Sequence, residues 1–428
     1  MNKLAGLVLF GLSTGVITAA GVACSSDPDA APPKGSSSSS GSTDEDAGVV
    51  DEDAGGGEDA GFDVKVPPPS TFPKAISEGG PVIKAPKVVA ITFKNDPMAA
   101  QIESFTTKMG TSTYWTSVAT EYGIGAITAK TPIRVNETAP TSTNLDGIMT
   151  WLQNKFTTDA ATFGTPDQST LYAIYYPSGT TISDGSLGTS CQQYGGFHFE
   201  TSAKGQRIGF AVMPRCNMPG QQDIDTLTVA ASHEYYEWAT DPFPQSAPAW
   251  SGVDADHYIW QRVFLAELGD LCTLPGLGYI KPADLGFTVQ RMWSNKLSLA
   301  GHHPCAPTPS GETFFTAIPT LEETITNPDV GGTTKGVKVG VGQKKTIPVT
   351  IFADGPVSTV NLQVLDIADA YYQRPAEFSY ALSKQSAAPG ETVQLTITGL
   401  TRAQAGYGFI LVARSGQKVN LWPGMVVN

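Results

Sequence analysis

The residues whose types and spacing best suit chemistry lie in the segment ASHEYYEWATDP, residues 231–242. His233 and Glu237 are four residues apart, so on a helix they share one face with Cβ atoms about 6 Å apart. One cation could therefore bind both side chains. Glu234 projects about 100° away on the helix, where its carboxylate could take a proton from water, as the glutamate of an HExxH motif does. The segment differs from that motif in carrying Glu237 at the position of the second histidine.

A catalytic metal site has at least three protein ligands, so another segment must supply one. Residues 266–272, AELGDLC, offer Glu267 and Asp270 beside a cysteine that could fix their loop. We expect Glu267 to complete the ligand set, with Asp270 as an alternative ligand or as a group that orients His233. Further candidates from the rest of the chain are Asp241, His257, His198 and the pair His302-His303.

The ligand types predict a divalent metal ion, with zinc as the first choice. Zinc binds carboxylate oxygen at about the same distance as imidazole nitrogen, so Glu237 preserves coordination. An oxygen-rich ligand set also suits manganese and calcium. Simpler explanations compete with a metal site: His233 and Glu237 could belong to a solvated helix face, and the acids of 266–272 could cap a turn. His198, between two phenylalanines, is expected to be structural.

The elements that must position these residues follow from hydrophobic periodicity. Short apolar runs indicate buried strands, and apolar residues recurring every three or four positions indicate helices. Asp225 or Thr226 is expected to cap the helix that carries His233, and Pro242 is expected to end it. The order of elements predicts an α/β layered domain. The expected elements before that helix are strands at 88–93 and 124–135, helices at 97–122, broken near Gly110, and at 144–156, a strand at 171–176, and a hairpin of 197–200 with 208–213.

Beyond about residue 308 the helical periodicity disappears, and short strands recur between turn signals. This spacing is typical of an all-β sandwich of immunoglobulin-like type. We therefore divide the folded chain into an α/β domain at 73–308 and a β-sandwich domain at 309–428. The strands expected in the second domain are 345–352, 360–365, 392–397 and 409–413.

The N-terminal part of the chain indicates an exported, tethered protein. Residues 1–23 have the apolar run and small residues of a signal peptide. GVAC, residues 21–24, resembles the lipobox of bacterial lipoproteins, in which the cysteine is lipidated, but Gly21 stands where leucine is usual. Cleavage before Cys24 without lipidation would also export the chain. Residues 24–72 are rich in Ser, Asp and Gly and are expected to form a disordered tether.

Four cysteines remain beside Cys24, and an even number in an exported chain indicates disulfides. The sequence permits three pairings. We predict the local one, Cys191 with Cys216 and Cys272 with Cys305, in which each bond would add about 3–4 kcal/mol in the chain-entropy model. A zinc cluster of cysteines is disfavoured because no CxxC spacing is present.

The order of the motifs HEYYEWATDP, ELGDLC and WSN, followed by a late cysteine, resembles a group of secreted bacterial and fungal zincin-like proteins. The resemblance covers roughly residues 80–306 and implies a zincin-like fold in which the histidine and the glutamates bind metal. More distantly, the segment is similar to plant EXORDIUM, or phosphate-induced, secreted proteins, which lack the His-Glu pair. The residues that match the pattern are His233, Glu234, Glu237, Thr240, Asp241, Pro242, Glu267, Gly269, Asp270, Cys272, Trp293, Ser294 and Asn295.

We expect an exported, lipid-anchored or secreted metal-dependent hydrolase, a metallopeptidase acting on polypeptide at the bacterial outer membrane or cell surface. In it His233, Glu237 and Glu267 hold the ion, and Glu234 is the general base. The edge strand of the 197–213 hairpin would pair with an extended peptide. The competing hypothesis is a non-catalytic cell-surface binding or adhesion protein on an EXORDIUM-like or degenerate zincin scaffold. The net charge of −13 lies mostly in the tether, and the folded part has no basic stripe or Arg-rich run, so nucleic acid is not expected as a partner.

Overall fold

The computed structural model describes residues 72–185, 188–217, 220, 222–273, 278–404 and 407–428. The expected signal peptide at 1–23, the lipidation site Cys24 and the tether up to residue 71 lie outside this range. Phe72, the first described residue, is buried against the rings of Phe314, Phe352 and Trp422. The described chain is a mixed α/β structure in which strands predominate.

A mixed sheet organises the first part of the chain. Its strands are β2 (Lys87–Thr92), β3 (Thr128–Ala129), β4 (Ile133–Arg134), β6 (Thr170–Tyr176), β9 (Phe197–Ala203) and β10 (Gln206–Pro214). The order is β3-β2-β6-β10-β9, with β4 also paired to β2. Strand β10 runs parallel to β6 and antiparallel to β9, which therefore ends the sheet. Strands β2, β6 and β10 are buried on both faces, as is typical of parallel strands covered by helices.

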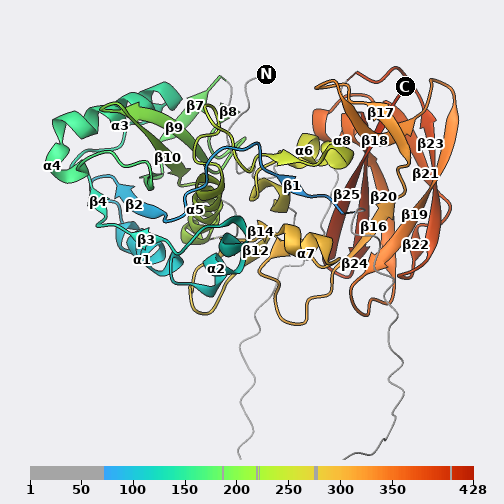
Figure 1. The fold of residues 1–428 in the computed structure, drawn as a ribbon, viewed down its shortest axis with the longest axis horizontal. Helices are drawn as coiled ribbons and strands as arrows, with labels where there is room; N and C mark the ends of the chain where they lie inside the picture. Colours follow the sequence, from blue (N-terminus) through green and yellow to red (C-terminus); the bar gives the residue numbers. More distant parts are fainter. Residues whose placement is uncertain (1–71, 186–187, 218–219, 221, 274–277, 405–406) are drawn as a thin grey trace, which may run out of the picture. The chain divides into compact units, whose positions relative to one another are not determined.

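Helices cover both faces of this sheet (Figure 1). Helices α1 (Ala99–Met109) and α5 (Asp223–Thr240) pack on one face, and α3 (Leu145–Thr158) packs on the other. The other helices are α2 (Thr113–Ala119), α4 (Ala160–Phe163), α6 (Tyr258–Phe264) and α7 (Asn295–Leu299), with short 3₁₀ turns η2 (Thr120–Tyr122), η3 (Ala255–His257) and η4 (Asp270–Cys272). Side chains alternate along a strand, so Val88 shares one core with α1 and α5, whereas Val89 shares the other with α3. Helix α5 is buried all round from Thr226 to Thr240, so its ionisable side chains are removed from water.

Short strands brace the loops around this layer. They are β1 (Ala75–Ile76) paired with β11 (Gly252–Val253), β5 (Ser142–Thr143) with β7 (Thr181–Asp184) and β8 (Gly188–Thr189), β12 (Tyr279–Ile280) with β13 (Val289–Gln290), and β14 (Met292–Trp293) with β15 (Cys305–Ala306). The pairs β12-β13 and β14-β15 follow the segment that carries Asp270 and hold its continuation in place.

Two elements differ from the sequence-based prediction. The strand expected at 124–135 is instead the two short strands β3 and β4, because Pro132 between them has no amide to donate to the sheet. Helix α5 begins at Asp223 and is not capped by Asp225 or Thr226. Both side chains are engaged elsewhere: the Asp225 carboxylate accepts a hydrogen bond from a threonine hydroxyl, and the Thr226 hydroxyl donates to the Asp223 carbonyl.

The C-terminal part of the chain forms two sheets with one buried core between them, which includes Val349, Leu395 and Leu411. One sheet has the order β16-β19-β23-β21, and the other β17-β18-β25-β24-β20-β22. The four strands expected from sequence correspond to β19, β20, β23 and β24. The elements are β16 (Phe315–Pro319), β17 (Glu323–Thr326), β18 (Thr333–Lys338), β19 (Lys344–Ala353), β20 (Val360–Asp366), α8 (Ile367–Tyr372), β21 (Phe378–Leu382), β22 (Ser386–Ala387), β23 (Thr392–Gly399), β24 (Gly408–Ser415) and β25 (Lys418–Val427).

Candidate metal centre

Three ionisable side chains of α5 lie in the protein interior. His233, Glu234 and Glu237 are 0% exposed. The spacing of four residues brings His233 Nε2 to 2.9 Å from Glu237 Oε1. This approach lacks hydrogen-bond geometry, and neither ring nitrogen of His233 has a hydrogen-bond partner. Burial lowers the pKa of His233, and the nearby Asp270 and Gln290 side chains offset only part of that change. The two side chains face a common point without being joined by a hydrogen bond.

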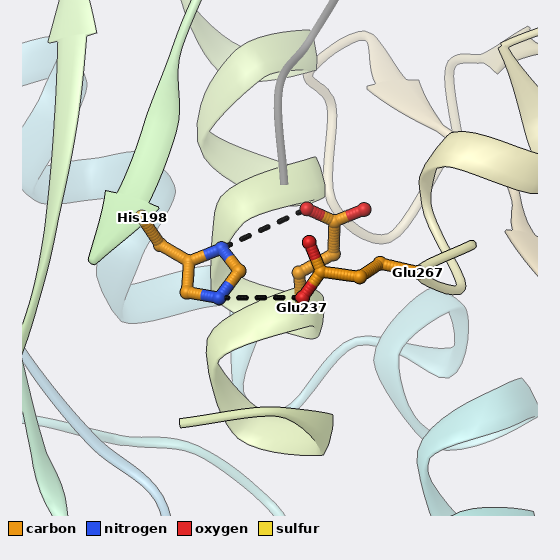
Figure 2. Close-up of side chains that lie close together, drawn as sticks. All are labelled: His198, Glu237 and Glu267. Carbon is orange, nitrogen blue, oxygen red and sulfur yellow. Dashed lines mark ion pairs between the residues drawn. The ribbon is translucent and has the colours of Figure 1, made fainter. Parts of the chain in front are cut away.

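Strand β9 brings a second histidine to this face of α5. The Nδ1 atom of His198 lies 3.3 Å from Glu234 Oε2 and 3.7 Å from Glu237 Oε2. Its Nε2 atom lies 3.1 Å from the carbonyl oxygen of Asp241 and 3.5 Å from Glu267 Oε1. Figure 2 shows the imidazole facing the carboxylates of Glu237 and Glu267. The histidine that sequence analysis expected to be structural therefore lies among the acids.

The loop after α6 supplies two further acids. Leu265, at the end of α6, has φ 62° and ψ −157°, a conformation nearly restricted to glycine that costs on the order of 1–3 kcal/mol. Beyond this turn, Asp270 Oδ1 lies 3.6 Å from His233 Nε2, and the Asp270 amide donates a hydrogen bond to Glu237 Oε1 at 3.1 Å. Glu267 reaches His198 from the same loop. Strain at this position is consistent with a loop whose path is set by the site.

Both predicted disulfides are confirmed: Cys191 pairs with Cys216, and Cys272 pairs with Cys305. Stable disulfides indicate an oxidising compartment. Cys272 is the last residue of η4, the turn that begins with Asp270. The second disulfide therefore fixes one end of the segment that carries the acids.

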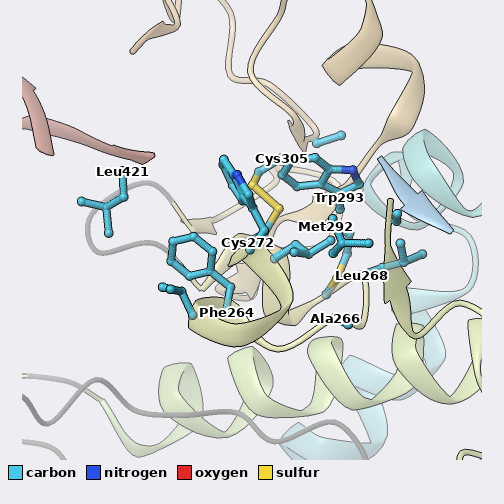
Figure 3. Packing of buried hydrophobic residues seen from close by; sticks show 14 of the residues in the cluster. Phe264, Ala266, Leu268, Cys272, Met292, Trp293, Cys305 and Leu421 are labelled. Carbon is cyan, nitrogen blue, oxygen red and sulfur yellow. A yellow bond between two sulfur atoms is a disulfide. The ribbon is translucent and has the colours of Figure 1, made fainter. Parts of the chain in front are cut away.

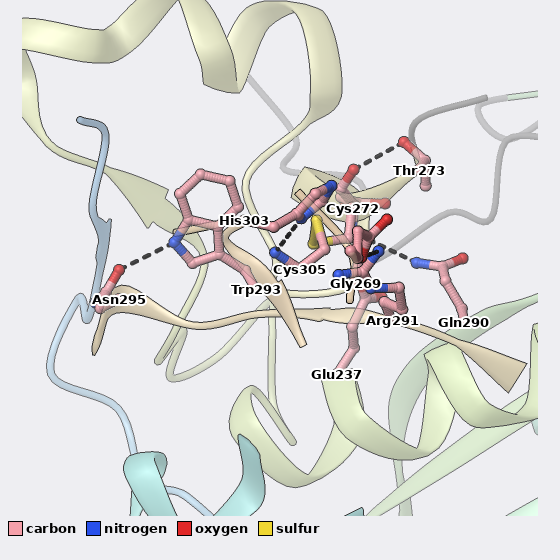
Figure 4. Close-up of a disulfide and its surroundings, with 12 residues drawn as sticks. Glu237, Gly269, Cys272, Thr273, Gln290, Arg291, Trp293, Asn295, His303 and Cys305 are labelled. Atoms are coloured by element: carbon pink, nitrogen blue, oxygen red, sulfur yellow. Dashed lines mark hydrogen bonds and ion pairs between the residues drawn. A yellow bond between two sulfur atoms is a disulfide. The ribbon is translucent and has the colours of Figure 1, made fainter. Parts of the chain in front are cut away.

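Packing and hydrogen bonds also hold this loop. Leu268 and Trp293 are buried beside the Cys272–Cys305 disulfide (Figure 3). The Gln290 amide donates to the carbonyl of Gly269 at 2.6 Å, and Trp293 Nε1 donates to the Asn295 side chain at 3.0 Å (Figure 4). The position of the acids is therefore determined by several independent contacts.

Burial governs the electrostatics of the cluster. Loss of hydration lowers the pKa of His198 to about 3 and also lowers the pKa of His233. Within the described chain, neither lysine nor arginine forms an ion pair with the acids of the cluster. Loss of hydration, reinforced by the charges of neighbouring acids, raises the pKa values of four carboxyl groups well above their usual range: those of Glu234, Glu237, Glu267 and Asp270.

The unsatisfied polar atoms fit a cation. Buried polar atoms normally have hydrogen-bond partners, yet both ring nitrogens of His233 and single oxygens of Glu234, Glu237 and Glu267 have none. With bonds of about 2.1 Å, ligand atoms of a tetrahedral zinc site lie about 3.4 Å apart. The separations of His233 Nε2 from Glu237 and Asp270, 2.9 Å and 3.6 Å, bracket that value. Imidazole and carboxylate are also the donors that zinc uses.

Two groups of three residues have potential ligand atoms within 4.8 Å of one another. One contains His233, Glu237 and Asp270, and the other contains His198, Glu237 and Glu267. The structure thus divides the ligand set expected from sequence: Asp270, the alternative ligand, lies with His233, whereas Glu267 lies with His198. Glu234 belongs to neither group, although its carboxylate lies beside His198.

The remaining sequence candidates lie outside both groups. Asp241 ends α5 and accepts a hydrogen bond from the Ala249 amide at 2.6 Å. His257 lies 2.8 Å from an oxygen of Asp254. The pair of histidines is split: one is exposed and the other buried, and neither belongs to a group of potential ligands. They are His302, which contacts Asp354 at 3.0 Å, and His303, which accepts a hydrogen bond from the Cys305 amide at 3.0 Å.

No protein-family model and no curated protein matches this chain. The chemistry assigned to the cluster therefore depends on its own geometry. Among the helices of the described ranges, none combines the length and apolar character needed to cross a bilayer.

The cluster is closed to solvent. Glu267 is 5% exposed and Asp270 is 2% exposed, while His198 and the three residues of α5 are fully buried. A substrate can reach these side chains only if a covering segment moves. Glu267 and Asp270, the only side chains of the cluster with measurable exposure, both belong to the loop that follows Leu265. This loop is therefore the part of the cluster nearest to solvent.

Proposed function

We propose that this protein is an exported metal-dependent hydrolase whose substrate is a polypeptide. The observation that carries the proposal is the buried group of His233, Glu237 and Asp270, in which the imidazole has no hydrogen-bond partner. A histidine that merely stabilised the core would normally have one. The proposal includes a zincin-like α/β domain at 73–308 and an immunoglobulin-like sandwich at 309–428.

In this proposal His233, Glu237 and Asp270 hold a divalent ion, with zinc as the first choice. Such an ion supplies Lewis acidity, which polarises a carbonyl group and makes water easier to deprotonate. Glu234 is the general base, because it follows His233 on α5 and its carboxylate lies beside His198 without belonging to either group of three. Its Oε1 atom has no hydrogen-bond partner in the described chain, so this oxygen can accept a proton from water.

The polypeptide would bind along β9. This strand ends its sheet, and in the described chain its only strand partner is β10. A free strand edge can pair with an extended peptide through main-chain hydrogen bonds. Because His198 is part of β9, a peptide bound there would run close to the cluster.

Export and anchoring complete the proposal. The two disulfides support an oxidising location. Lipidation at Cys24 would place the protein at a bacterial outer membrane or cell surface, and secretion without lipidation is the alternative. Mass spectrometry of the mature N-terminus would distinguish the two, because only a lipidated Cys24 carries the added acyl mass.

Metal content of the purified protein tests the central claim. We expect the wild-type chain to retain zinc after dialysis and His233→Ala to retain markedly less. Equal metal content in the two proteins would refute ligation by His233. The exposed histidine in His302→Ala provides the matched control, because it lies outside the cluster and should leave metal content unchanged.

Glu234→Gln tests the base. The substitution preserves shape but cannot accept a proton, so we expect metal to be retained and digestion of a broad peptide library to slow by about 10²–10⁴-fold. Unchanged hydrolysis would exclude Glu234 from this role.

The closed cluster favours a second candidate, a non-catalytic surface-binding or adhesion protein in which the ion is structural. Its motivating observation is that no ligand side chain exceeds 5% exposure. In that case removal of metal would lower the melting temperature, while wild type and Glu234→Gln would both leave every peptide uncut. Metal-dependent hydrolysis by the wild type would exclude this candidate.

A further inference from the structure

We propose that the cluster holds two divalent cations bridged by Glu237, with His198 as a ligand of the second. This inference rests on the proposed function in so far as both require the cluster to bind metal. Its starting point is that the two groups of potential ligands share one residue: His233 and Asp270 stand on one side of Glu237, and His198 and Glu267 on the other.

The two oxygens of Glu237 face different partners. Oε1 lies 2.9 Å from His233 Nε2 and accepts the amide hydrogen of Asp270, whereas Oε2 lies 3.7 Å from His198 Nδ1 and has no hydrogen-bond partner. A carboxylate that bridges two ions directs one oxygen to each. Bridged pairs in hydrolases lie about 3.5–4 Å apart, a separation that one carboxylate can span.

The surroundings of His198 show which of its nitrogens is available. A carbonyl oxygen only accepts hydrogen bonds, so the contact with Asp241 requires Nε2 of His198 to carry the hydrogen. In the neutral ring Nδ1 then carries a lone pair, which faces oxygens of Glu234 and Glu237 at 3.3 Å and 3.7 Å, while the N–H of Nε2 also faces Glu267 Oε1 at 3.5 Å. The lone pair of His198 Nδ1 and the carboxylate oxygens of Glu234 and Glu237 repel one another, so their close approach is favourable only if a cation or a proton lies between them. A ring N–H donated to a backbone carbonyl is also the usual way in which a metal-ligating histidine is oriented.

Charge favours two ions over one. Glu234, Glu237, Glu267 and Asp270 are buried together, and in the described part of the chain no lysine or arginine pairs with them. One divalent ion would balance two ionised carboxylates, and the other two would have to be protonated or remain as uncompensated buried charges, which are costly. Two divalent ions balance all four. Asp241 is a fifth acid nearby, and its carboxylate accepts a hydrogen bond from a backbone amide.

The stoichiometry of metal binding tests this inference on the intact mature chain. After removal of metal with a chelator, we would titrate zinc(II) and measure bound metal by calorimetry and elemental analysis. We expect two ions per wild-type chain, and one ion in each of His198→Ala and Asp270→Asn. His302→Ala should still bind two. One ion per wild-type chain would overturn the bridged pair while leaving the proposed function intact, and no bound ion would overturn both.

Manganese(II) provides a measurement that does not depend on variants. Two manganese ions bridged by a carboxylate should give the electron paramagnetic resonance spectrum of a spin-coupled pair, whereas single ions give an uncoupled six-line spectrum. We expect the coupled spectrum in the wild type at two equivalents and its loss in His198→Ala. An uncoupled spectrum at full loading would exclude bridging by Glu237. Circular dichroism would establish that each variant is folded, and for a variant that is not, the wild-type stoichiometry and spectrum decide the question.

Discussion

At the scale of single residues, Gly269 determines how closely the acidic loop approaches α5. A Cβ atom at this position would lie 2.6 Å from His233 Nδ1 and 2.8 Å from Glu237 Oε1. Both atoms belong to buried side chains that cannot retreat into solvent. The glycine of ELGDLC is therefore required for close approach of the backbone, which is one of the few physical reasons for glycine inside a packed segment.

We predict that Gly269→Ala displaces the loop from α5. Overpacking of a core typically costs about 1–3 kcal/mol, and disturbance of groups that orient metal ligands typically lowers metal affinity by roughly 10–100-fold. Chemical denaturation and zinc titration would measure the two effects. Gly185→Ala is the matched control, since a Cβ at that position would contact nothing within 4 Å. Equal zinc affinity in the two variants would contradict the prediction.

His303 gives a prediction about pH. Burial, followed by the charges of Arg291 and Lys418, holds the pKa of His303 well below 6.5, and its Nδ1 accepts the amide hydrogen of Cys305. The unfolded chain therefore binds a proton near pH 6.5 that the folded chain does not. The stability contributed by the neutral ring is present above pH 6.5 and is lost as pH falls below it, by up to about 1.4 kcal/mol per pH unit.

His303→Asn should remove this component, because an amide oxygen can accept the same hydrogen bond without titrating. The measurement is the free energy of unfolding of both proteins between pH 5 and pH 8. We expect the free energy of unfolding of the wild type to fall relative to that of the variant as the pH decreases below 6.5. A difference that is constant across that range would show that His303 has the same proton affinity in both states.

At the scale of elements, the Cys272–Cys305 disulfide connects the end of η4 to β15. The chain-entropy model assigns about 3–4 kcal/mol to a loop of this length. We predict that the double substitution of both cysteines by serine lowers the free energy of unfolding by that amount and also weakens zinc binding, because the end of the acidic loop is released. Guanidinium denaturation and zinc titration measure both quantities.

The Cys191–Cys216 disulfide is the matched comparison. Its loop is similar, with a sequence separation of 25 against 33 residues, but it precedes α5 and lies outside the acidic loop. Its removal by the same double substitution should cost similar stability and change zinc affinity less, because β9, which carries His198 within that loop, is also held by its pairing with β10. Equal losses of zinc affinity in the two double variants would mean that the effect is one of general destabilisation.

Local pattern was enough to predict most of the elements that hold the site. The apolar runs at 88–93 and 171–176 correspond to β2 and β6, since continuous apolar segments of that length belong to covered parallel strands. The spacing of His233 and Glu237 likewise brought them together, because four residues on a helix share a face. Where the pattern is irregular the prediction was wrong, as at 124–135, which Pro132 divides.

The role of His198 could not be predicted in the same way. Alternation of aromatic residues around it indicates a half-buried strand and says nothing about what the strand faces. Its place among the acids depends on β9 ending the sheet next to α5, which is a property of strand order. Strand order is set by long-range packing, and sequence spacing does not encode it.

At the scale of the whole molecule, aromatic packing joins the helical part of the chain to the C-terminal sheets. Trp422 of β25 lies 5.3 Å from the ring of Trp260 in α6 and 5.6 Å from that of Phe72, in edge-to-face geometry. Arg262 of α6 forms an ion pair with Asp329. Helix α6 leads directly into the loop that carries Glu267, so the C-terminal sheets support one wall of the candidate metal centre.

Trp422→Ala should therefore weaken the metal centre from a distance. Loss of a buried tryptophan typically costs about 3–5 kcal/mol, and here the cavity would open beside α6. We expect the wild type to unfold in one transition in which zinc release and loss of secondary structure coincide, and the variant to release zinc at a lower temperature. Tyr371→Ala, at a side chain that is 46% exposed, should shift neither signal, since substitutions at exposed positions usually change stability by within about 0.5 kcal/mol. Two separate transitions in the wild type, with zinc release unaffected by Trp422→Ala, would show instead that the sheets at 309–428 fold without influence on the site.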